Sequence, residues 1–450
     1  MVEGSENNNN PQKKLILPPQ PLNGVFSVTV QDVSITVIKL VKSGSVNKFK
    51  IVAKTFAGLE NVLADEIRAL GGESISVERR AVSFFGNQEL MYRANFHLRT
   101  ALKILKPVAE FDVTDRDELY DRAKSVQWSD YLALGKSFAI DSTVQSEMFI
   151  NSMYASLKVK DAIADHFREK TGKRPSVNTE NPDIRINVYL MGEHCILSLD
   201  SSGESLHKRG YRIGQGEAPI NEVLAAGMIL LTGWNGKKDF LDPMCGSGTI
   251  LIEAAMIAKG IPPGMYRKAF GFEQWPDFNE ELFDEICNGE YEKDYTGKII
   301  GSDISVKDIA IARANIKNAS LTKVIDLQVQ DFMKLDAPFT NGIIITNPPY
   351  GERMKPSSIL DLYQSIGNTF KNKYAGFEAW IISSSLEGFM NIGLKPSKKI
   401  ELFNGALACS YRSFELFHGS HKQAVIIKKG NAPSNEINPY RSRPVLIKKP

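Results

Sequence analysis

The sequence predicts an α/β protein in which a domain with a mostly parallel sheet follows smaller α+β units. Three observations lead to this prediction. From about residue 218 onwards, short β-branched runs alternate with helical patterns, as in a parallel sheet buried on both faces. The dipeptide Asn404-Gly405 lies between two strand-like runs and predicts a hairpin, so we expect the sheet to end in an antiparallel strand. With 450 residues, the chain is long enough for two or three domains.

The first α+β unit is expected at residues 49–89. Its sequence reads in the order strand, helix, strand, strand, which is typical of a small α+β unit. The helix has apolar residues at helical spacing and ends at Gly71-Gly72. The expected elements are strands at 49–53, 74–77 and 81–85 and a helix that begins near Gly58 and ends at Leu70.

A second α+β unit is expected at residues 90–202. Two apolar runs near its end lie on either side of Gly192 and predict a hairpin. The other expected elements are a strand and a helix with apolar residues on one face. They are a strand at 137–143, a helix at 152–167 and hairpin strands at 184–190 and 194–200.

The third domain is expected at residues 203–420, and it carries the parallel sheet. A long segment at 260–297 interrupts its rhythm and contains two consecutive prolines. The expected strands are 240–241, 299–302, 325–329, 342–346 and 379–383, followed by the hairpin strands 399–403 and 406–410.

The two ends of the chain show neither the α+β pattern of the first two units nor the alternating pattern of the third domain. Residues 1–48 include an Asn-rich run and a Pro-rich run and are expected to form a disordered extension. Residues 421–450 carry six Lys or Arg residues from Lys428 onwards against the single acid Glu436. A solvated flexible tail is the simpler interpretation of this segment, and a phosphate-binding arm is the alternative.

The strongest local feature links an apolar strand to a glycine-rich turn. Glycine lets such a loop bend sharply and approach a ligand closely. A dinucleotide-binding loop has a third glycine where this chain has Leu251, which disfavours NAD. A lone Gly-x-Gly also occurs in tight turns that hold no ligand. The cofactor-binding candidates in this loop are Asp242, Pro243, Met244, Cys245, Gly246 and Gly248.

The next two strand ends carry further candidates for the same ligand. Asp303 ends the second strand, where a carboxylate accepts hydrogen bonds from both hydroxyls of a ribose. Asp331 and Phe332 end the third strand and are expected to bind an adenine amino group and to cover its ring. Each Asp would also suit a helix N-cap. Because ligands of open α/β sheets bind at the carboxyl ends of the strands, the three features together indicate one cofactor site.

The fourth strand runs into Asn347-Pro348-Pro349-Tyr350, the most specific feature of the sequence. An exocyclic amino nitrogen of a base is a poor nucleophile, because its lone pair is delocalised into the ring. If the Asn347 side-chain oxygen and the Pro348 carbonyl accept its two N–H groups, a pyramidal nitrogen is favoured. The prolines restrict φ and so hold that carbonyl in place. Tyr350 offers a flat face for stacking, so all four residues are catalytic candidates, and Asn347 is expected to border the cofactor as well.

With these residues in place, the chain resembles the THUMP-domain class I RNA methyltransferases. Within that group it is most similar to the bacterial enzymes that methylate guanine N2 in 23S ribosomal RNA. The resemblance covers about residues 49–417. It rests on the segments Phe56 to Glu60, Pro182 to Val188, Leu199 to Arg212, Ala218 to Ile220, Leu241 to Ala258 and Asn347 to Met354.

The resemblance implies a Rossmann-like class I methyltransferase domain, preceded by α+β ferredoxin-like and THUMP domains. It implies S-adenosyl-L-methionine as the cofactor and the N2 atom of a guanine in RNA as the methyl acceptor. The expected partner is 23S rRNA or a precursor of the large ribosomal subunit, which the THUMP domain helps to dock. Some members carry a second methyltransferase domain, and we expect a single activity here.

The same resemblance places a basic segment where the N-terminal and catalytic halves meet. Its RNA-binding candidates are Lys208, Arg209 and Arg212. A basic linker without an RNA contact is the alternative interpretation. Three other functions stay open: a DNA adenine-N6 methyltransferase, a protein glutamine methyltransferase and a non-catalytic RNA-binding scaffold. The RNA-associated N-terminal half argues against the first two, and the intact Asn-Pro-Pro-Tyr loop argues against the third.

Composition adds expectations about compartment and metals. The formal net charge is +3, so any basic surface is local. The four cysteines are far apart and form no Cys-x-x-Cys pair, which favours a reducing, cytoplasmic location and no zinc site. A sulfonium methyl donor needs no metal, so no metal is expected. We expect no membrane partner, because no apolar run approaches the roughly 18 residues of a membrane span.

Overall fold

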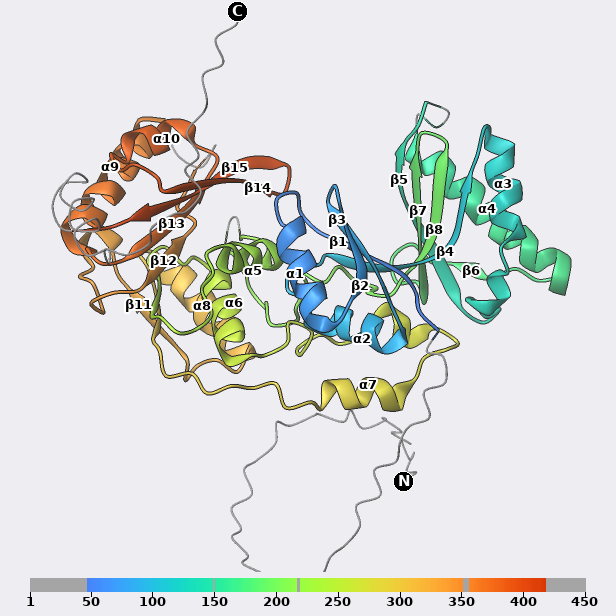
Figure 1. Ribbon diagram of the computed structural model, residues 1–450, viewed down its shortest axis with the longest axis horizontal. Coiled ribbons are helices and arrows are strands. Elements are labelled where there is room, and N and C mark those ends of the chain that lie inside the picture. The colour runs from blue at the N-terminus through green and yellow to red at the C-terminus, as the bar shows by residue number, and fades with distance from the viewer. Residues whose placement is uncertain (1–46, 148, 150, 217–218, 351–355, 418–450) are drawn as a thin grey trace, which may run out of the picture. The chain divides into compact units, whose positions relative to one another are not determined.

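The computed structural model describes most of the chain between residues 47 and 417 (Figure 1). The expected extension, apart from its last two residues, and the basic tail at 421–450 lie outside the described residues. Within the described part of the chain, no helix combines the length and the apolar character needed to cross a membrane. The described ranges are 47–147, 149, 151–216, 219–350 and 356–417.

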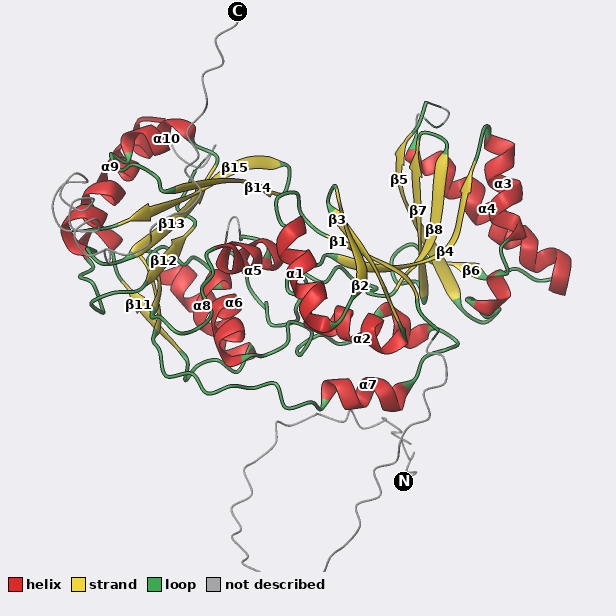
Figure 2. Ribbon diagram, in the orientation of Figure 1, coloured by secondary structure: helices red, strands yellow, loops and turns green. Residues whose placement is uncertain are grey.

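Eight strands form one sheet in the N-terminal half, in the order β2-β3-β1-β4-β8-β7-β5-β6 (Figure 2). The expected hairpin at Gly192 joins β7 to β8 and is confirmed. Helices α3 and α4 pack together, and α4 packs on β5 (Figure 1). The strands are β1 (Phe49–Lys54), β2 (Glu73–Glu78), β3 (Ala81–Gly86), β4 (Lys103–Asp112), β5 (Ser137–Gln145), β6 (Ser176–Val177), β7 (Ile184–Met191) and β8 (His194–Asp200). The helices are α1 (Glu60–Leu70), α2 (Gln88–His97), α3 (Arg116–Ser125) and α4 (Ser152–Thr171).

Strand β4 has no counterpart in the sequence prediction, and it joins the two expected α+β units into one sheet. It pairs antiparallel with β1 on one side and with β8 on the other. It contains Pro107, and a proline argues against a central strand because it donates no hydrogen bond to the ladder. The register shifts between Pro107 and Ala109, so an irregularity accommodates the missing donor. Hydrogen bonding therefore crosses the boundary expected at residue 89.

The C-terminal half holds a seven-stranded sheet in the order β11-β10-β9-β12-β13-β15-β14. The five strands from β11 to β13 run parallel, and β15 pairs antiparallel with β13 and with β14. The predicted parallel sheet with an antiparallel terminal hairpin is confirmed. The strands are β9 (Phe240–Asp242), β10 (Ile299–Asp303), β11 (Ile325–Val329), β12 (Ile343–Thr346), β13 (Glu378–Ser383), β14 (Lys398–Asn404) and β15 (Leu407–Glu415). The helices are α5 (Glu222–Leu231), α6 (Thr249–Lys259), α7 (Glu280–Cys287), α8 (Val306–Asn318), α9 (Pro356–Lys373) and α10 (Leu386–Asn391).

The parallel sheet is buried on both faces, as its continuous apolar strands predict. In β12, Ile343 and Ile345 belong to one hydrophobic cluster, whereas Ile344 belongs to the cluster on the opposite face. This alternation follows from the two-residue period of a strand. Helix α6 contributes to the first cluster and α9 to the second, so helices cover both faces.

Leu251 explains why the cofactor loop departs from the dinucleotide pattern. It is fully buried in α6, immediately after the glycine-rich turn. A Cβ atom on Gly301 in the neighbouring strand β10 would lie 2.2 Å from a Leu251 methyl carbon. The close approach of helix and strand therefore depends on a glycine in the strand rather than in the helix.

The two halves share packed surfaces. Phe56 and Leu59 from the N-terminal half belong to a core cluster of the C-terminal half. In turn, the 260–297 segment of the C-terminal half packs against the N-terminal half. Its Phe272 ring stacks on Tyr92 of α2 at a centroid distance of 4.2 Å. Arg99 also donates to the carbonyl of Ile261 over 2.8 Å. Removing the N-terminal half would therefore expose part of the hydrophobic core of the C-terminal half.

Candidate active site

The cofactor loop runs from the end of β9 to the start of α6, at the carboxyl edge of the parallel sheet. Gly246 and Gly248 have φ values of 52° and 82°, in the left-handed region that favours glycine. The loop is tied to the next strand, because the Cys245 amide donates to the Ser302 carbonyl over 2.9 Å. The Gly246 amide donates to the Asp303 carboxylate, also over 2.9 Å.

A cavity of about 590 Å³ opens at this edge. It brings together candidates from β9, β10, β11 and β12, as the sequence predicts for the carboxyl ends of parallel strands. Three candidates do not line it, namely Gly248, Pro348 and Tyr350. The candidates that line it are Asp242, Pro243, Met244, Cys245, Gly246, Asp303, Asp331, Phe332, Asn347 and Pro349.

The two strand-end aspartates have different structural roles. Asp303 accepts the Gly246 amide and the Ser305 amide, each over 2.9 Å, and the N-cap of α8 is Ser305 rather than Asp303. Asp331 is the N-cap of a short 3₁₀ helix and accepts the Met333 amide over 2.9 Å. The alternative interpretation as a cap thus describes Asp331, whereas Asp303 connects two loops of the cavity. Both carboxylates also line the cavity.

Asp242 is buried between the cofactor loop and the predicted catalytic loop, Asn347-Pro348-Pro349-Tyr350, with 1% of its surface exposed. It accepts the Thr346 hydroxyl over 2.9 Å and the Met244 amide over 3.4 Å. Burial raises the pKa of this carboxyl from 3.8 to about 7, and the nearby Asp303 charge adds to the shift. The two hydrogen bonds act in the opposite direction.

This shift predicts a pH dependence for the ligand-free protein. Because the folded-state pKa of Asp242 lies above its unfolded value, its stabilising contribution is complete below about pH 4 and is lost as pH rises to about 7. Asparagine does not titrate, so the wild type should lose unfolding free energy between pH 5 and pH 8 that Asp242→Asn keeps. The stability advantage of the variant should therefore grow by roughly 2 kcal/mol over this range. Urea denaturation at both pH values measures this gain. Parallel profiles for the two proteins would contradict the assignment.

The catalytic loop places its four residues in different surroundings. Asn347 lines the cavity, and its Oδ1 atom is buried without a hydrogen-bond partner in the described structure. Pro349 lines the cavity and is exposed, whereas Pro348 is buried. Tyr350 is 3% exposed, and its hydroxyl accepts from the Asn404 amide over 3.0 Å. Its role as a stacking face stays a prediction, since residues 351–355, which follow it, lie outside the described residues.

The structure adds a cavity residue that the sequence analysis did not single out. Ile304 follows Asp303 directly, lines the cavity and is 71% exposed. Its exposure singles it out, and exposure is not visible in the sequence. Its exposed face suits contact with a flat ring. Helix α9 contributes Leu362 to the same cavity.

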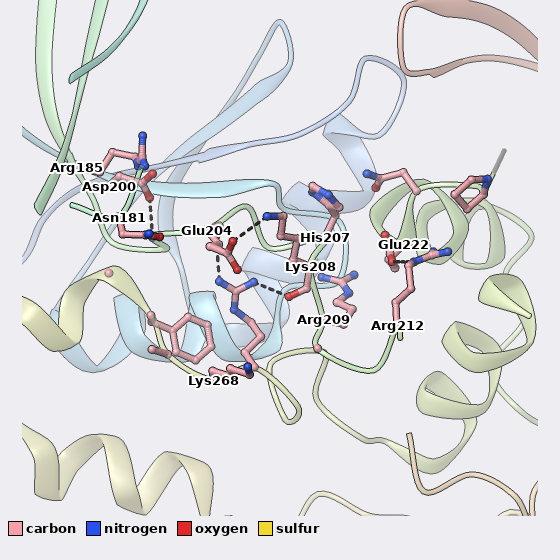
Figure 3. Close-up of a pocket in the computed structure, with 18 of the residues that line it drawn as sticks. Asn181, Arg185, Asp200, Glu204, His207, Lys208, Arg209, Arg212, Glu222 and Lys268 are labelled. Carbon is pink, nitrogen blue, oxygen red and sulfur yellow. Dashed lines mark hydrogen bonds and ion pairs between the residues drawn. The ribbon is translucent and has the colours of Figure 1, made fainter. Parts of the chain in front are cut away.

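A second, larger cavity of about 1090 Å³ is lined by both halves of the protein (Figure 3). Pro219 and Ile220 line this cavity and the cofactor cavity alike. Asn404, the residue that donates to the Tyr350 hydroxyl, also lines the larger one. The larger cavity therefore borders both the cofactor cavity and the catalytic loop.

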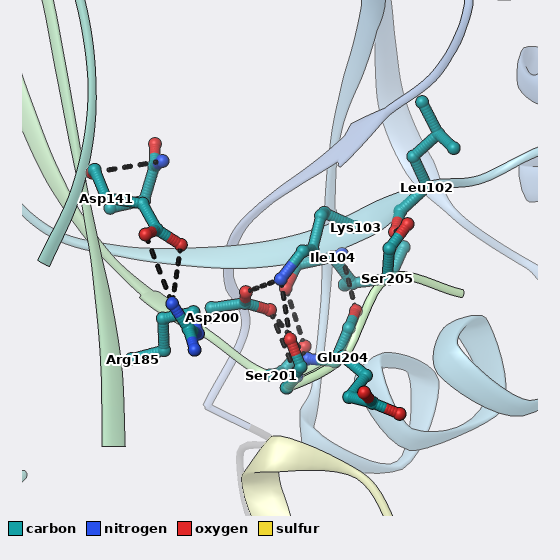
Figure 4. A network of polar contacts seen from close by, with 12 residues as sticks. Leu102, Lys103, Ile104, Asp141, Arg185, Asp200, Ser201, Glu204 and Ser205 are labelled. Carbon is teal, nitrogen blue, oxygen red and sulfur yellow. Dashed lines mark hydrogen bonds and ion pairs between the residues drawn. The ribbon is translucent and has the colours of Figure 1, made fainter. Parts of the chain in front are cut away.

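Most charged groups at the N-terminal end of the larger cavity are already paired (Figure 4). Lys103 binds the buried Asp200 carboxylate and donates to the Gly203 carbonyl over 2.6 Å. Arg185 donates to both carboxylate oxygens of Asp141 over 3.1 Å. These side chains support the wall of the cavity and leave little free charge there.

The three predicted RNA-binding residues differ in accessibility. Lys208 is exposed, lines the larger cavity and forms an ion pair with Glu204 over 2.7 Å. Arg209 is 2% exposed and forms a buried ion pair with Glu253 over 3.4 Å, so its assignment as an RNA contact is corrected. A buried guanidinium that has a carboxylate partner has no free face for a phosphate. Arg212 bonds mainly to the cofactor loop and to Glu222.

Comparison with known proteins places this geometry in a family. Three family models match successive parts of the chain. An RlmL ferredoxin-like domain matches residues 50–105, a THUMP domain matches 113–200, and an RMKL-like methyltransferase domain matches 209–413. A putative RNA methyltransferase of Synechocystis is 35% identical over 80% of this chain and 95% of its own length. The chain belongs to the THUMP-containing, RMKL-like methyltransferase family.

The family assignment confirms the predicted class I methyltransferase fold with preceding ferredoxin-like and THUMP domains. A solved putative methyltransferase in complex with SAH superimposes with a TM-score of 0.75 at 33% identity, over 83% of this chain and 99% of that one. The ribosomal RNA large subunit methyltransferase K/L of Photobacterium profundum is 38% identical over 86% of this chain. The chain spans just over half of that relative, 56% of its length.

Proposed function

We propose that this methyltransferase transfers a methyl group from S-adenosyl-L-methionine to the exocyclic N2 amino nitrogen of a guanine in RNA. The observation that carries the proposal is the Asn347 Oδ1 atom, a buried acceptor without a described partner at the edge of the cofactor cavity. A buried unsatisfied acceptor costs about 1–3 kcal/mol unless a ligand donates to it. An amino group of a base is a donor that would satisfy it.

The residues of the cofactor cavity fit S-adenosyl-L-methionine. An ionised carboxylate accepts about four hydrogen bonds, so Asp303 has acceptor capacity for ribose hydroxyls beyond the two amides that it already binds. Asp331 would accept from the adenine amino group, and Phe332 together with the exposed face of Ile304 would cover the ring. When bound, the cofactor supplies an already activated methyl group.

The task of the chain is to orient the nitrogen. Asn347 Oδ1 and the Pro348 carbonyl would each accept one N–H of the amine, which localises its lone pair and directs it towards the methyl carbon. Asp242 holds the base of this loop through the Thr346 hydroxyl. No side chain has to remove a proton before transfer, because the nitrogen would bond to the methyl carbon as the methyl–sulfur bond breaks and would release its proton to solvent water afterwards.

The larger cavity is the proposed approach for the RNA. It borders the cofactor cavity at Pro219 and Ile220, and its lining continues to the THUMP side of the N-terminal half at Arg185. The target base has to leave its stack to reach Asn347, at a cost of a few kcal/mol. Flanking nucleotides in the larger cavity would offset that cost. A loop or distorted helix is therefore the expected target rather than a regular duplex.

The choice of guanine N2 in 23S rRNA rests on the family resemblance, because the catalytic loop suits any exocyclic amine. The test is incubation of the protein with radiolabelled cofactor and unmodified 23S rRNA, followed by digestion to nucleosides. We expect label in N2-methylguanosine. Label in N6-methyladenosine would refute the guanine assignment and leave the mechanism intact. Label found only in protein would refute RNA as the substrate.

Two exposed lysines of the larger cavity test the RNA approach. The Lys268 side chain is exposed and has no ion pair or hydrogen bond among the described residues, and the Lys208 ammonium pairs with the exposed Glu204. We expect the double variant Lys208→Glu/Lys268→Glu to raise the KM for RNA about tenfold. It should also lower the slope of binding against salt by roughly two, since each phosphate contact contributes about one.

The matched control for this charge reversal is Lys238→Glu/Lys323→Glu. Both lysines are exposed, and they line neither of the two cavities. Filter binding at several salt concentrations measures the slope, and S-adenosyl-L-methionine affinity should be unchanged in both double variants. An equal loss of RNA affinity in the two variants would show that net charge, rather than this cavity, determines binding.

A further inference from the structure

Arg212 lies between the two cavities. It lines the larger one together with Glu222 (Figure 3). The hydroxyls that it contacts belong to Ser247 and Thr249, which line the cofactor cavity. Only 18% of the Arg212 side chain is exposed, so most of its surface faces protein rather than a ligand.

The guanidinium of Arg212 binds two chain segments at once, residues 220–222 and residues 247–249. Its Nε donates to Glu222 at the start of α5 over 2.6 Å. Its Nη2 donates to the Thr249 hydroxyl over 2.8 Å and to the Ile220 carbonyl over 3.2 Å, and Nη1 reaches the Ser247 hydroxyl over 3.3 Å. A planar fork with fixed donor directions suits this arrangement, whereas a lysine ammonium is a single point of charge.

The cofactor loop depends on this fork. Ser247 and Thr249 flank Gly248 and are 6% and 3% exposed. Among the described residues, Arg212 is the one side chain that bonds to both hydroxyls. The Ser247 carbonyl is held as well, by the Asn315 amide over 3.1 Å. Without Arg212, two buried hydroxyls of a glycine-rich loop would lose their hydrogen-bond partner. The loop could then adopt more conformations.

We propose that Arg212 is the positioning residue of the cofactor loop, which it holds in its ligand-binding shape from the side of the larger cavity. This inference rests on the proposed use of that loop for S-adenosyl-L-methionine. It assigns Arg212 to cofactor affinity rather than to RNA contact. The ion pair with Glu222 orients the guanidinium, and the Ser247 and Thr249 hydroxyls accept its hydrogen bonds.

Two sets of substitutions separate positioning from stability. Arg212→Lys keeps a positive charge beside the buried Glu222 and removes the fork, so the melting temperature should stay near that of the wild type. Its dissociation constant for S-adenosyl-L-methionine should rise about tenfold. The double variant Ser247→Ala/Thr249→Val leaves the ion pair intact and removes both acceptors, and it should show a similar loss. Arg212→Lys in that background should add little further loss, because the contacts are already absent.

The readouts are calorimetric affinity for S-adenosyl-L-methionine, RNA affinity by filter binding, and amide hydrogen exchange of the ligand-free protein. Exchange of residues 244–249 should speed up in both variants, while exchange in β13 stays unchanged. Lys237→Gln, an exposed change outside both cavities, is the matched control. Exchange in the ligand-free protein tests the loop independently of catalysis.

The outcomes distinguish this inference from the function on which it rests. A wild-type protein without affinity for S-adenosyl-L-methionine would overturn the proposed function and this inference together. Wild-type binding with unchanged affinity and unchanged loop exchange in Arg212→Lys would overturn the positioning role alone. Weaker RNA binding with unchanged cofactor affinity would make Arg212 an RNA contact and would also overturn it.

Discussion

Asn347→Ala is expected to lose most of the methyl transfer while its affinity for S-adenosyl-L-methionine stays within about twofold of the wild type. The Asn347 oxygen has no hydrogen-bond partner in the described structure, so removing it leaves no other described group unsatisfied. Its contribution arises as the amine becomes pyramidal in the transition state. Loss of one such acceptor typically lowers kcat by about 100- to 1000-fold. Single-turnover kinetics on the RNA substrate, with calorimetry for the cofactor, measure the two quantities separately.

Two further variants sharpen this test. Asn347→Asp keeps an acceptor oxygen at the same place and should retain more turnover than the alanine variant. Asn341→Ala, an exposed change shortly before β12, should leave both quantities unchanged. Turnover in Asn347→Ala within about fivefold of the wild type would remove this side chain from the mechanism.

Asp303→Ala should weaken S-adenosyl-L-methionine binding by roughly 5- to 150-fold. The carboxylate is expected to accept from the ribose hydroxyls, and it holds the Gly246 amide over 2.9 Å. Both contacts are lost together in alanine, and an unmade hydrogen bond at a buried partner costs about 1–3 kcal/mol. Calorimetry on the ligand-free protein measures the change.

Asparagine at position 303 separates the two contributions of that carboxylate. Asp303→Asn keeps one acceptor oxygen, so the Gly246 contact should persist while the acceptor capacity towards ribose is reduced. Its affinity should fall between the wild type and alanine. Asp326→Ala removes an exposed aspartate of β11 outside the cofactor cavity and is the matched control. Wild-type affinity in Asp303→Ala would reject the ribose assignment.

Most strands and loops of the catalytic half could be predicted from the sequence, because each is specified by a short run of neighbouring residues. Buried parallel strands appear as β-branched runs, the Asn404-Gly405 turn specifies the terminal hairpin, and glycines mark the loop after β9. Strand order then brings residues from four strand ends to one edge, so most cofactor candidates line a single cavity. Ile304 was missed, since its significance depends on exposure, which the sequence does not display.

The sheet of the N-terminal half was harder to predict, because it is assembled from strands that are distant in sequence. Strand β4 carries a proline in the middle of its sequence, and only its partners β1 and β8 show that it is central. The ferredoxin-like match ends at residue 105 and the THUMP match begins at residue 113, so most of β4 (Lys103–Asp112) lies between the two matches. Hydrogen bonds between strands therefore join into one sheet the two units that the sequence patterns separate.

The sequence by itself determined the class of chemistry and predicted cofactor and catalytic residues at strand ends, because each signal is encoded in a short run of adjacent residues. Only the tertiary structure decided the roles of the basic segment. Lys208, Arg209 and Arg212 look alike in sequence, yet one is exposed, one is buried against Glu253, and one holds the cofactor loop. The reason is that an arginine binds phosphate or protein according to which acceptors surround it, and those acceptors come from elements far along the chain.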